Sequence, residues 1–190
     1  MRTVSFGMNI SLDGCCDHTS FGPTQESAEE MYNYFTGMMD DVDLLFYGRV
    51  MYQLMFPYWA DIAKENKEEK WEVDFAKRLT SIDKVVVSRT LGAADVMENA
   101  RVISGNPVEA LRKLKEQTGG RISVDTVSML PELINAGLVD EFHIVIHPVI
   151  VGKGRHLFDA GSLEKNLSLK LVETRQFKSA GIIALHYQRR

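Results

Sequence analysis

The stretch Asp43-Leu44-Leu45-Phe46-Tyr47-Gly48-Arg49 decides the class of fold. Its apolar residues follow one another almost without interruption, which is typical of a strand covered on both faces. A helix is expected to begin at Gly48-Arg49, so this strand leads directly into a helix. Residues 83–88, which contain three consecutive valines, repeat the signal of a buried strand. Buried strands that alternate with helices are typical of α/β folds with a mostly parallel sheet.

Strand and helix signals alternate outward from this stretch to both ends of the chain. Further strands are expected at residues 3–11, 101–104, 121–125 and 139–151. Further helices are expected after a capping box at residues 27–30, at about 64–79, at 106–119 and from about 128 to 137. Residues 167–173 and 182–188 are expected to form a hairpin. The sequence therefore predicts one domain over residues 1–190, with a three-layer α/β/α fold, a mostly parallel central sheet and an antiparallel C-terminal hairpin.

The helix expected after the capping box has one apolar face. Its apolar residues recur at helical spacing, and they are Ala28, Met31, Tyr32, Phe35, Met38 and Met39. We interpret this face as part of the core rather than as a cage for a ligand.

Composition excludes several classes of protein. Apolar residues make up 45% and charged residues 25% of the 190-residue chain, as in ordinary globular proteins. The net charge of −4 argues against nucleic-acid binding, which needs a basic face. No apolar run approaches the roughly 18 residues of a membrane span, and the N-terminal residues do not form a signal peptide. The only cysteines, Cys15 and Cys16, are adjacent and cannot staple an extracellular fold, so we expect a cytoplasmic protein without nucleic-acid or membrane partners.

Four short motifs follow predicted strands, where α/β folds build their binding sites. Gly48-Arg49 could hold a phosphate between the free amides of a helix N-terminus and a guanidinium. Ser88-Arg89-Thr90 offers two hydroxyl groups and a cation. Ser11-Leu12-Asp13-Gly14 and Gly152-Lys153-Gly154 follow two further strands. Each glycine could instead serve only a turn and each arginine only the surface, but two arginine-bearing strand ends in one sheet favour a ligand site.

Two other kinds of site do not fit the sequence. The segment Gly152-Lys153-Gly154 lacks the third glycine of a dinucleotide-binding fingerprint. His143 and His147 would chelate zinc as neighbours on a helix, but the apolar residues between them favour a strand, in which four residues span roughly 13 Å. We therefore predict no metal site.

In their order along the chain, the motifs resemble the dihydrofolate-reductase-like superfamily. They are most similar to stand-alone relatives of the riboflavin-biosynthesis reductase (RibD C-terminal) domain. The resemblance covers nearly the whole chain. It is carried by residues 11–14, 44–49 with Tyr52, 86–90, 136–141, 147–154, and 171–175 with Phe177 and Leu185.

The resemblance implies NADPH as the hydride donor, and often a homodimer. It implies that Gly48 and Arg49 meet the phosphates of the cofactor. It also puts Ser88-Arg89-Thr90 at the 2′-phosphate, where a guanidinium would favour NADPH over NADH through a bidentate pair. Asp13 and Gly14 would border the nicotinamide, with Asp13 as the candidate catalytic polar group. The other implied cofactor contacts are Thr126, Val127, Ser128, Gly152 and Gly154.

The chain departs from the family pattern at two points. The family usually has a Gly-Gly or Gly-Ser pair after the strand at residues 121–125, whereas this chain continues Asp125-Thr126-Val127-Ser128. Side chains there could crowd the pyrophosphate, although the hydroxyls of Thr126 and Ser128 could compensate. Met51 replaces the hydroxyl residue of the family's Gly-Arg-x-Thr pattern.

The leading hypothesis is an NADPH-dependent reductase that acts on a small heterocyclic (pterin or ribosylaminopyrimidine-like) or carbonyl substrate. The alternative is a non-catalytic nucleotide- or small-molecule-binding protein on the same fold. The His-x-Glu and Cys-x-x-Cys zinc ligands of the deaminase partner are absent from the sequence, so we do not expect the bifunctional riboflavin enzyme.

Overall fold

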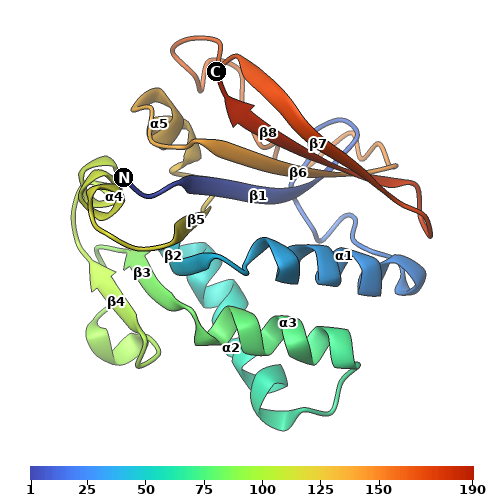
Figure 1. Cartoon of the computed structure of the whole chain (residues 1–190), viewed down its shortest axis with the longest axis horizontal. Helices are drawn as coiled ribbons and strands as arrows, with labels where there is room; N and C mark the ends of the chain where they lie inside the picture. The colour runs from blue at the N-terminus through green and yellow to red at the C-terminus, as the bar shows by residue number, and fades with distance from the viewer.

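The structure is a computed structural model that describes residues 1–190. Eight strands form one sheet in the order β4-β3-β2-β5-β1-β6-β8-β7 (Figure 1). The first six strands in chain order pair in parallel, and the last two pair antiparallel at one end of the sheet. The strands are β1 (Val4–Ser11), β2 (Val42–Gly48), β3 (Asp83–Val87), β4 (Ala100–Ile103), β5 (Arg121–Asp125), β6 (Glu141–His147), β7 (Leu169–Phe177) and β8 (Ile182–Arg189).

Helices cover both faces of this sheet, so the molecule has three layers (Figure 1). One face carries α1 (Gln25–Met38), α2 (Arg49–Glu65) and α3 (Lys70–Ser81). The opposite face carries α4 (Pro107–Glu116) and α5 (Leu130–Asn135). None of the helices has the length and apolar character needed to cross a membrane.

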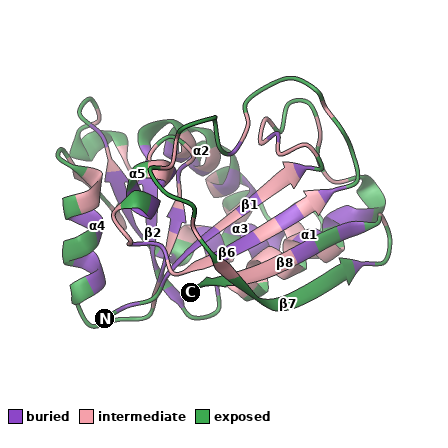
Figure 2. Cartoon of the chain, turned by 90° about the horizontal axis from the view of Figure 1, so that it is seen from above, coloured by how far each residue is buried: buried purple, intermediate pink, exposed green.

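Successive side chains of the central strands point to opposite faces of the sheet, because side chains alternate along a β-strand. In β2, Phe46 belongs to the cluster that packs against α4 and α5, whereas Leu45 and Tyr47 belong to the cluster that packs against α2 and α3. All three side chains are at most 1% exposed. Burial on both faces explains the nearly unbroken apolar run of this strand. Strand β7, by contrast, is exposed along most of its length (Figure 2).

The order of the strands creates a crevice. The chain moves outward from β2 to β3 and β4, and then returns to insert β5 between β2 and β1. Ligands of open α/β sheets bind where the strand order reverses in this way, at the carboxyl ends of the strands. The ends of β3, β2, β5, β1 and β6 lie next to one another along this edge, because neighbouring strands among them are parallel.

The predicted fold class, parallel sheet and C-terminal hairpin are confirmed, and several boundaries were wrong. The helix expected at about 64–79 begins later, at Lys70, because the helix that starts at Arg49 continues to Glu65 and the chain then turns at Asn66 in a left-handed conformation (φ 54°). The capping motif of α1 lies three residues earlier than predicted, where the Thr24 amide donates to the Ser27 hydroxyl (3.0 Å). The strand expected at 139–151 is shorter and ends before Pro148, which cannot donate a ladder hydrogen bond.

Candidate active site

A cavity of about 240 Å³ lies between the sheet and helices α1, α2 and α3. Twenty residues line it and fourteen of them are hydrophobic. Its floor is the face of β1, β2 and β5 at the crevice, and its walls are helical. Helix α1 contributes Met31, Tyr32, Phe35 and Met38, which the sequence analysis interpreted as core. That interpretation was incomplete, since these side chains also face an open volume.

Apart from His18, which comes from the loop between β1 and α1, most polar groups of the cavity lie on its floor. Strand register places Tyr47 of β2 directly beside Asp125 of β5, and Ser123 beside Ser5 of β1. The neighbouring floor residue Gly7 has no side chain, and a Cβ there would lie 3.0 Å from the Cε of Met38. The floor therefore presents a short polar row at the bottom of an apolar chamber.

Asp125 is the unusual residue of this row. Its Oδ2 atom is fully buried and has no hydrogen-bond partner. Burial raises the pKa of Asp125 from 3.8 to about 7, although the hydroxyls of Ser123 and Tyr47 act in the opposite direction. Burial, followed by the nearby charge of Asp125, raises the pKa of Tyr47 well above its usual value of 10. Near neutral pH the site thus holds a neutral phenol and a carboxyl group that can both give and take a proton.

The raised pKa of Asp125 makes stability depend on pH. The unfolded chain loses this proton near pH 3.8 and the folded chain near pH 7, so the folded state binds more protons in the window between them. Stability therefore falls as pH rises through that window. Asp125→Asn carries no charge at this position. We therefore expect the free energy of unfolding of the variant, relative to that of the parent, to rise by on the order of 3 kcal/mol from pH 4 to pH 8. Denaturant unfolding of both proteins at the two pH values measures this gain, and a difference independent of pH would contradict the raised pKa.

The predicted phosphate-binding residues line up along the carboxyl edge of the sheet. Ser88-Arg89-Thr90 follows β3, Gly48-Arg49 joins β2 to α2, and Thr126 follows β5. The Ser88 hydroxyl accepts hydrogen bonds from the amides of Thr90 (3.1 Å) and Leu91 (3.0 Å), which fixes this turn. Arg89 is exposed and makes no hydrogen bond or ion pair, while exposed Arg49 donates to the Gln53 side chain (2.9 Å). Both guanidinium groups therefore lie free enough to meet an anion.

The segment that replaces the glycine pair turns most of its side chains inward. A Cβ on Gly48 would lie 3.0 Å from the Oγ1 of Thr126 and 3.2 Å from the Cε of Met129, so the side chains of Thr126 and Met129 pack closely against Gly48. Thr126 is only 2% exposed, and Val127 packs against the core beneath α4 and α5. Only Ser128 is exposed at this edge. The crowding that the sequence suggested is thus smaller than the residue types imply.

Asp13 holds two loops together. Its carboxylate accepts hydrogen bonds from the amides of Val151 (3.1 Å) and Gly152 (2.7 Å) and from the Ser11 hydroxyl (2.5 Å). These bonds hold the pKa of Asp13 well below its usual value, and the bond from Ser11 has the largest effect. Asp13 does not line the cavity beside Asp125. Gly14 and Gly152 both adopt positive φ values, 83° and 69°, so this junction depends on glycine.

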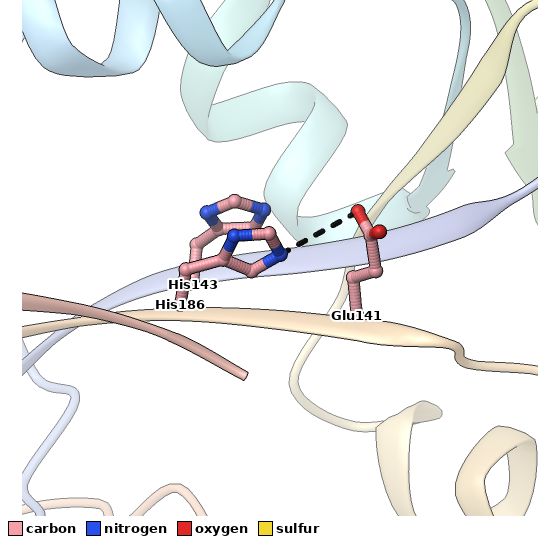
Figure 3. A group of neighbouring side chains, drawn as sticks. All are labelled: Glu141, His143 and His186. Carbon is pink, nitrogen blue, oxygen red and sulfur yellow. Dashed lines mark ion pairs between the residues drawn. The ribbon is translucent and has the colours of Figure 1, made fainter. Parts of the chain in front are cut away.

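A second cluster of titratable groups lies on β6 and β8, and sequence reasoning missed it because His186 is distant in the chain. Ligand atoms of Glu141, His143 and His186 lie within 4.8 Å of one another (Figure 3). The two imidazole rings are stacked, with centroids 4.1 Å apart and planes 13° from parallel. The nitrogen lone pairs of two stacked rings point in nearly parallel planes. They therefore do not converge on one metal ion at the bond length of about 2 Å. Arg121 also donates to the Glu141 carboxylate (3.1 Å), so this arrangement is not preformed for a metal.

Fold and cavity together define the class of protein, an α/β protein with the dihydrofolate-reductase-like fold. Among solved structures, the chain is similar to a putative riboflavin biosynthesis protein from Shewanella sp. PV-4, with a TM-score of 0.67, 18% identity and coverage of 99% of both chains. It is also similar to dihydrofolate reductase from Enterococcus faecalis complexed with NADP(H) and RAB-propyl, with a TM-score of 0.63 and 12% identity over 99% of this chain and 96% of that one.

The sequence then gives the family. The chain belongs to the RibD C-terminal domain family, which it matches over residues 2–183. It is 34% identical over 187 residues to the protein YyaP of Bacillus subtilis (strain 168), a match that covers 98% of this chain and 94% of YyaP. The predicted resemblance is confirmed.

Asp125 is a candidate functional residue that sequence reasoning did not single out. In the sequence, Asp125 stood out only as the first residue of the segment that replaces the glycine pair. A signal was nevertheless available, because residues alternate between the two faces of a strand. Val124 faces the core under α4 and α5, so Asp125 must face the opposite side, where the cavity lies.

Proposed function

We propose that this protein is an NADPH-dependent reductase whose substrate ring lies in the cavity above β1, β2 and β5. The observation that carries the proposal is Asp125, a carboxyl group with a pKa of about 7 on the floor of an apolar cavity at the crevice of the sheet. Reduction of a C=N or C=O bond needs a hydride for one atom and a proton for the other. A buried acid with a pKa near the working pH is suited to deliver that proton.

The residues along the carboxyl edge suit a dinucleotide phosphate. Ser88-Arg89-Thr90 would hold the 2′-phosphate through the free guanidinium and two hydroxyls, and Gly48-Arg49 would hold the pyrophosphate at the N-terminus of the 17-residue helix α2. The absence of a Cβ on Gly48 lets the Thr126 side chain lie close to this turn. Ser128, with the backbone of Thr126 and Val127, would complete this contact. When bound, NADPH supplies the hydride.

We assign different roles to the two acids of the crevice. Asp125 would protonate the substrate, with Tyr47 beside it as a neutral hydrogen-bond donor. Asp13 stays ionised at neutral pH, so it has no proton to give. We propose that Asp13, together with Gly14, Gly152 and Gly154, shapes the loops at the nicotinamide end of the cofactor.

Consumption of NADPH tests this function. The protein is mixed with NADPH and a panel of pterins, aminopyrimidines and small carbonyl compounds, and loss of nicotinamide absorbance is followed. We expect turnover with at least one heterocycle and a clear preference for NADPH over NADH. Absence of saturable NADPH binding in a fluorescence titration would overturn the proposal.

The second candidate is a non-catalytic nucleotide-binding protein on the same fold. The replacement of the glycine pair by Asp125-Thr126-Val127-Ser128 is the observation that favours it. Tight NADPH binding without turnover of any compound in the panel would support this candidate.

Assembly and location also belong to the proposal. A homodimer and a cytoplasmic location, where reduced dinucleotide is available and the free thiols of Cys15 and Cys16 stay reduced, suit such a reductase. Mass measurement in solution distinguishes a dimer from a monomer.

A further inference from the structure

We infer that the cavity selects an uncharged planar ring with apolar substituents and rejects ligands that carry a phosphate or a carboxylate. The inference rests on the proposed function and names the substrate class of that same site. Its basis is the lining of the cavity, which combines a polar row on the floor with largely apolar walls and contains no lysine or arginine. His18 is a polar side chain outside the floor.

The walls of the cavity suit the faces and edges of an aromatic ring. Aromatic side chains from three helices lie there, including Tyr32, Trp59 and Phe75, which pack edge-to-face with centroids about 5 Å apart. Six methionines complete the lining, and their flexible thioethers adapt to ligands of different outline. The methionines are Met8, Met31, Met38, Met39, Met51 and Met55.

The floor supplies the polar recognition. Asp125, Ser123, Ser5 and the hydroxyl of Tyr47 can hydrogen-bond only to groups on one edge of a ring. A conjugated heterocycle with nitrogen or carbonyl groups along one edge satisfies this row. The rest of its outline must be apolar, because polar groups there would face methionine and phenylalanine without partners.

Charge and size argue against an anionic tail. A phosphate or carboxylate in the cavity would lose its hydration without finding a lysine or arginine, and His18 is the only lining residue that can carry a positive charge. Asp125 would repel the anion whenever it is ionised. The volume of about 240 Å³ is below the roughly 300–1,000 Å³ typical of ligand pockets. A ring without a long substituent suits this volume better than a ring with a ribosyl phosphate.

A matched set of ligands tests the inference. Pterins that carry either a methyl group or a carboxylate at the same ring position are titrated against the full-length protein, with and without NADPH. A ribosylaminopyrimidine is titrated with and without its 5′-phosphate. Tryptophan fluorescence reports binding, because Trp59 lines the cavity. We expect each neutral ligand to bind at least about ten times more tightly than its anionic counterpart, because the anion brings one unpaired charge into the cavity.

Two variants of helix α2 sharpen this test. Leu54 and Val50 are both 69% exposed on α2, but only Leu54 lines the cavity. We expect Leu54→Lys to improve binding of the carboxylated pterin several-fold, and Val50→Lys to leave it unchanged. Anionic ligands that bind the parent as tightly as the neutral ones would overturn the inference while leaving the reductase proposal intact. Failure of the reductase proposal would appear separately, as absence of NADPH binding.

Discussion

Replacement of Asp125 by asparagine is expected to lower kcat by about 10²–10⁴-fold, the usual contribution of a positioned general acid. The amide has the same shape but no proton to transfer. NADPH affinity should remain close to that of the parent, because Asp125 lies on the cavity floor and not at the edge where the phosphates would bind. Steady-state turnover and an NADPH titration of both proteins measure the two effects.

The pH profile makes this prediction specific. Turnover of the parent should fall as pH rises through about 7, where Asp125 loses its proton, and the variant should lack this limb. Asp61→Asn removes an exposed aspartate from α2 outside the cavity and serves as the control. A variant at position 125 with parental kcat would remove Asp125 from the mechanism.

Replacement of Arg89 by alanine is expected to weaken NADPH binding by about 10- to 150-fold, equivalent to the roughly 1.5–3 kcal/mol of a charge-assisted hydrogen bond. NADH lacks the 2′-phosphate, so its affinity should change little. The variant should therefore lose most of the discrimination between the two cofactors. Fluorescence titrations with both dinucleotides measure the loss.

Arg112→Ala is the matched control for this prediction. Arg112 is also exposed and its removal changes the net charge equally, but it lies on α4 at the opposite face of the sheet. A control that weakens NADPH as much as Arg89→Ala would indicate a general electrostatic effect. Equal losses for NADPH and NADH would place Arg89 away from the 2′-phosphate.

Local patterns predicted most of the fold because they report burial directly. The apolar run of β2 and the three valines of β3 require cover on both faces, and the structure provides it. The Asn106-Pro107 helix start is also confirmed, with the Asn106 side chain accepting from the amides of Val108 (2.8 Å) and Glu109 (3.1 Å). The helix expected at 64–79 was placed too early at its N-terminal end, because the left-handed turn at Asn66 has no clear signal in a charged segment.

The site was less predictable, since it depends on which strands become neighbours. Sequence motifs located the loops at the carboxyl edge, but the insertion of β5 between β2 and β1 is a property of the whole sheet. That insertion brings Asp125 beside Tyr47 and beneath the methionines of α1. The raised pKa of Asp125 follows from this burial and could not be read from the sequence.

A crystal structure with bound NADPH would test the proposed cofactor site. We expect the 2′-phosphate at Ser88-Arg89-Thr90, the pyrophosphate between Gly48-Arg49 and Thr126, and the nicotinamide at the cavity that Asp125 lines. A cofactor bound elsewhere, or a Thr126-Val127 segment that excludes the pyrophosphate from the edge of the sheet, would contradict this expectation.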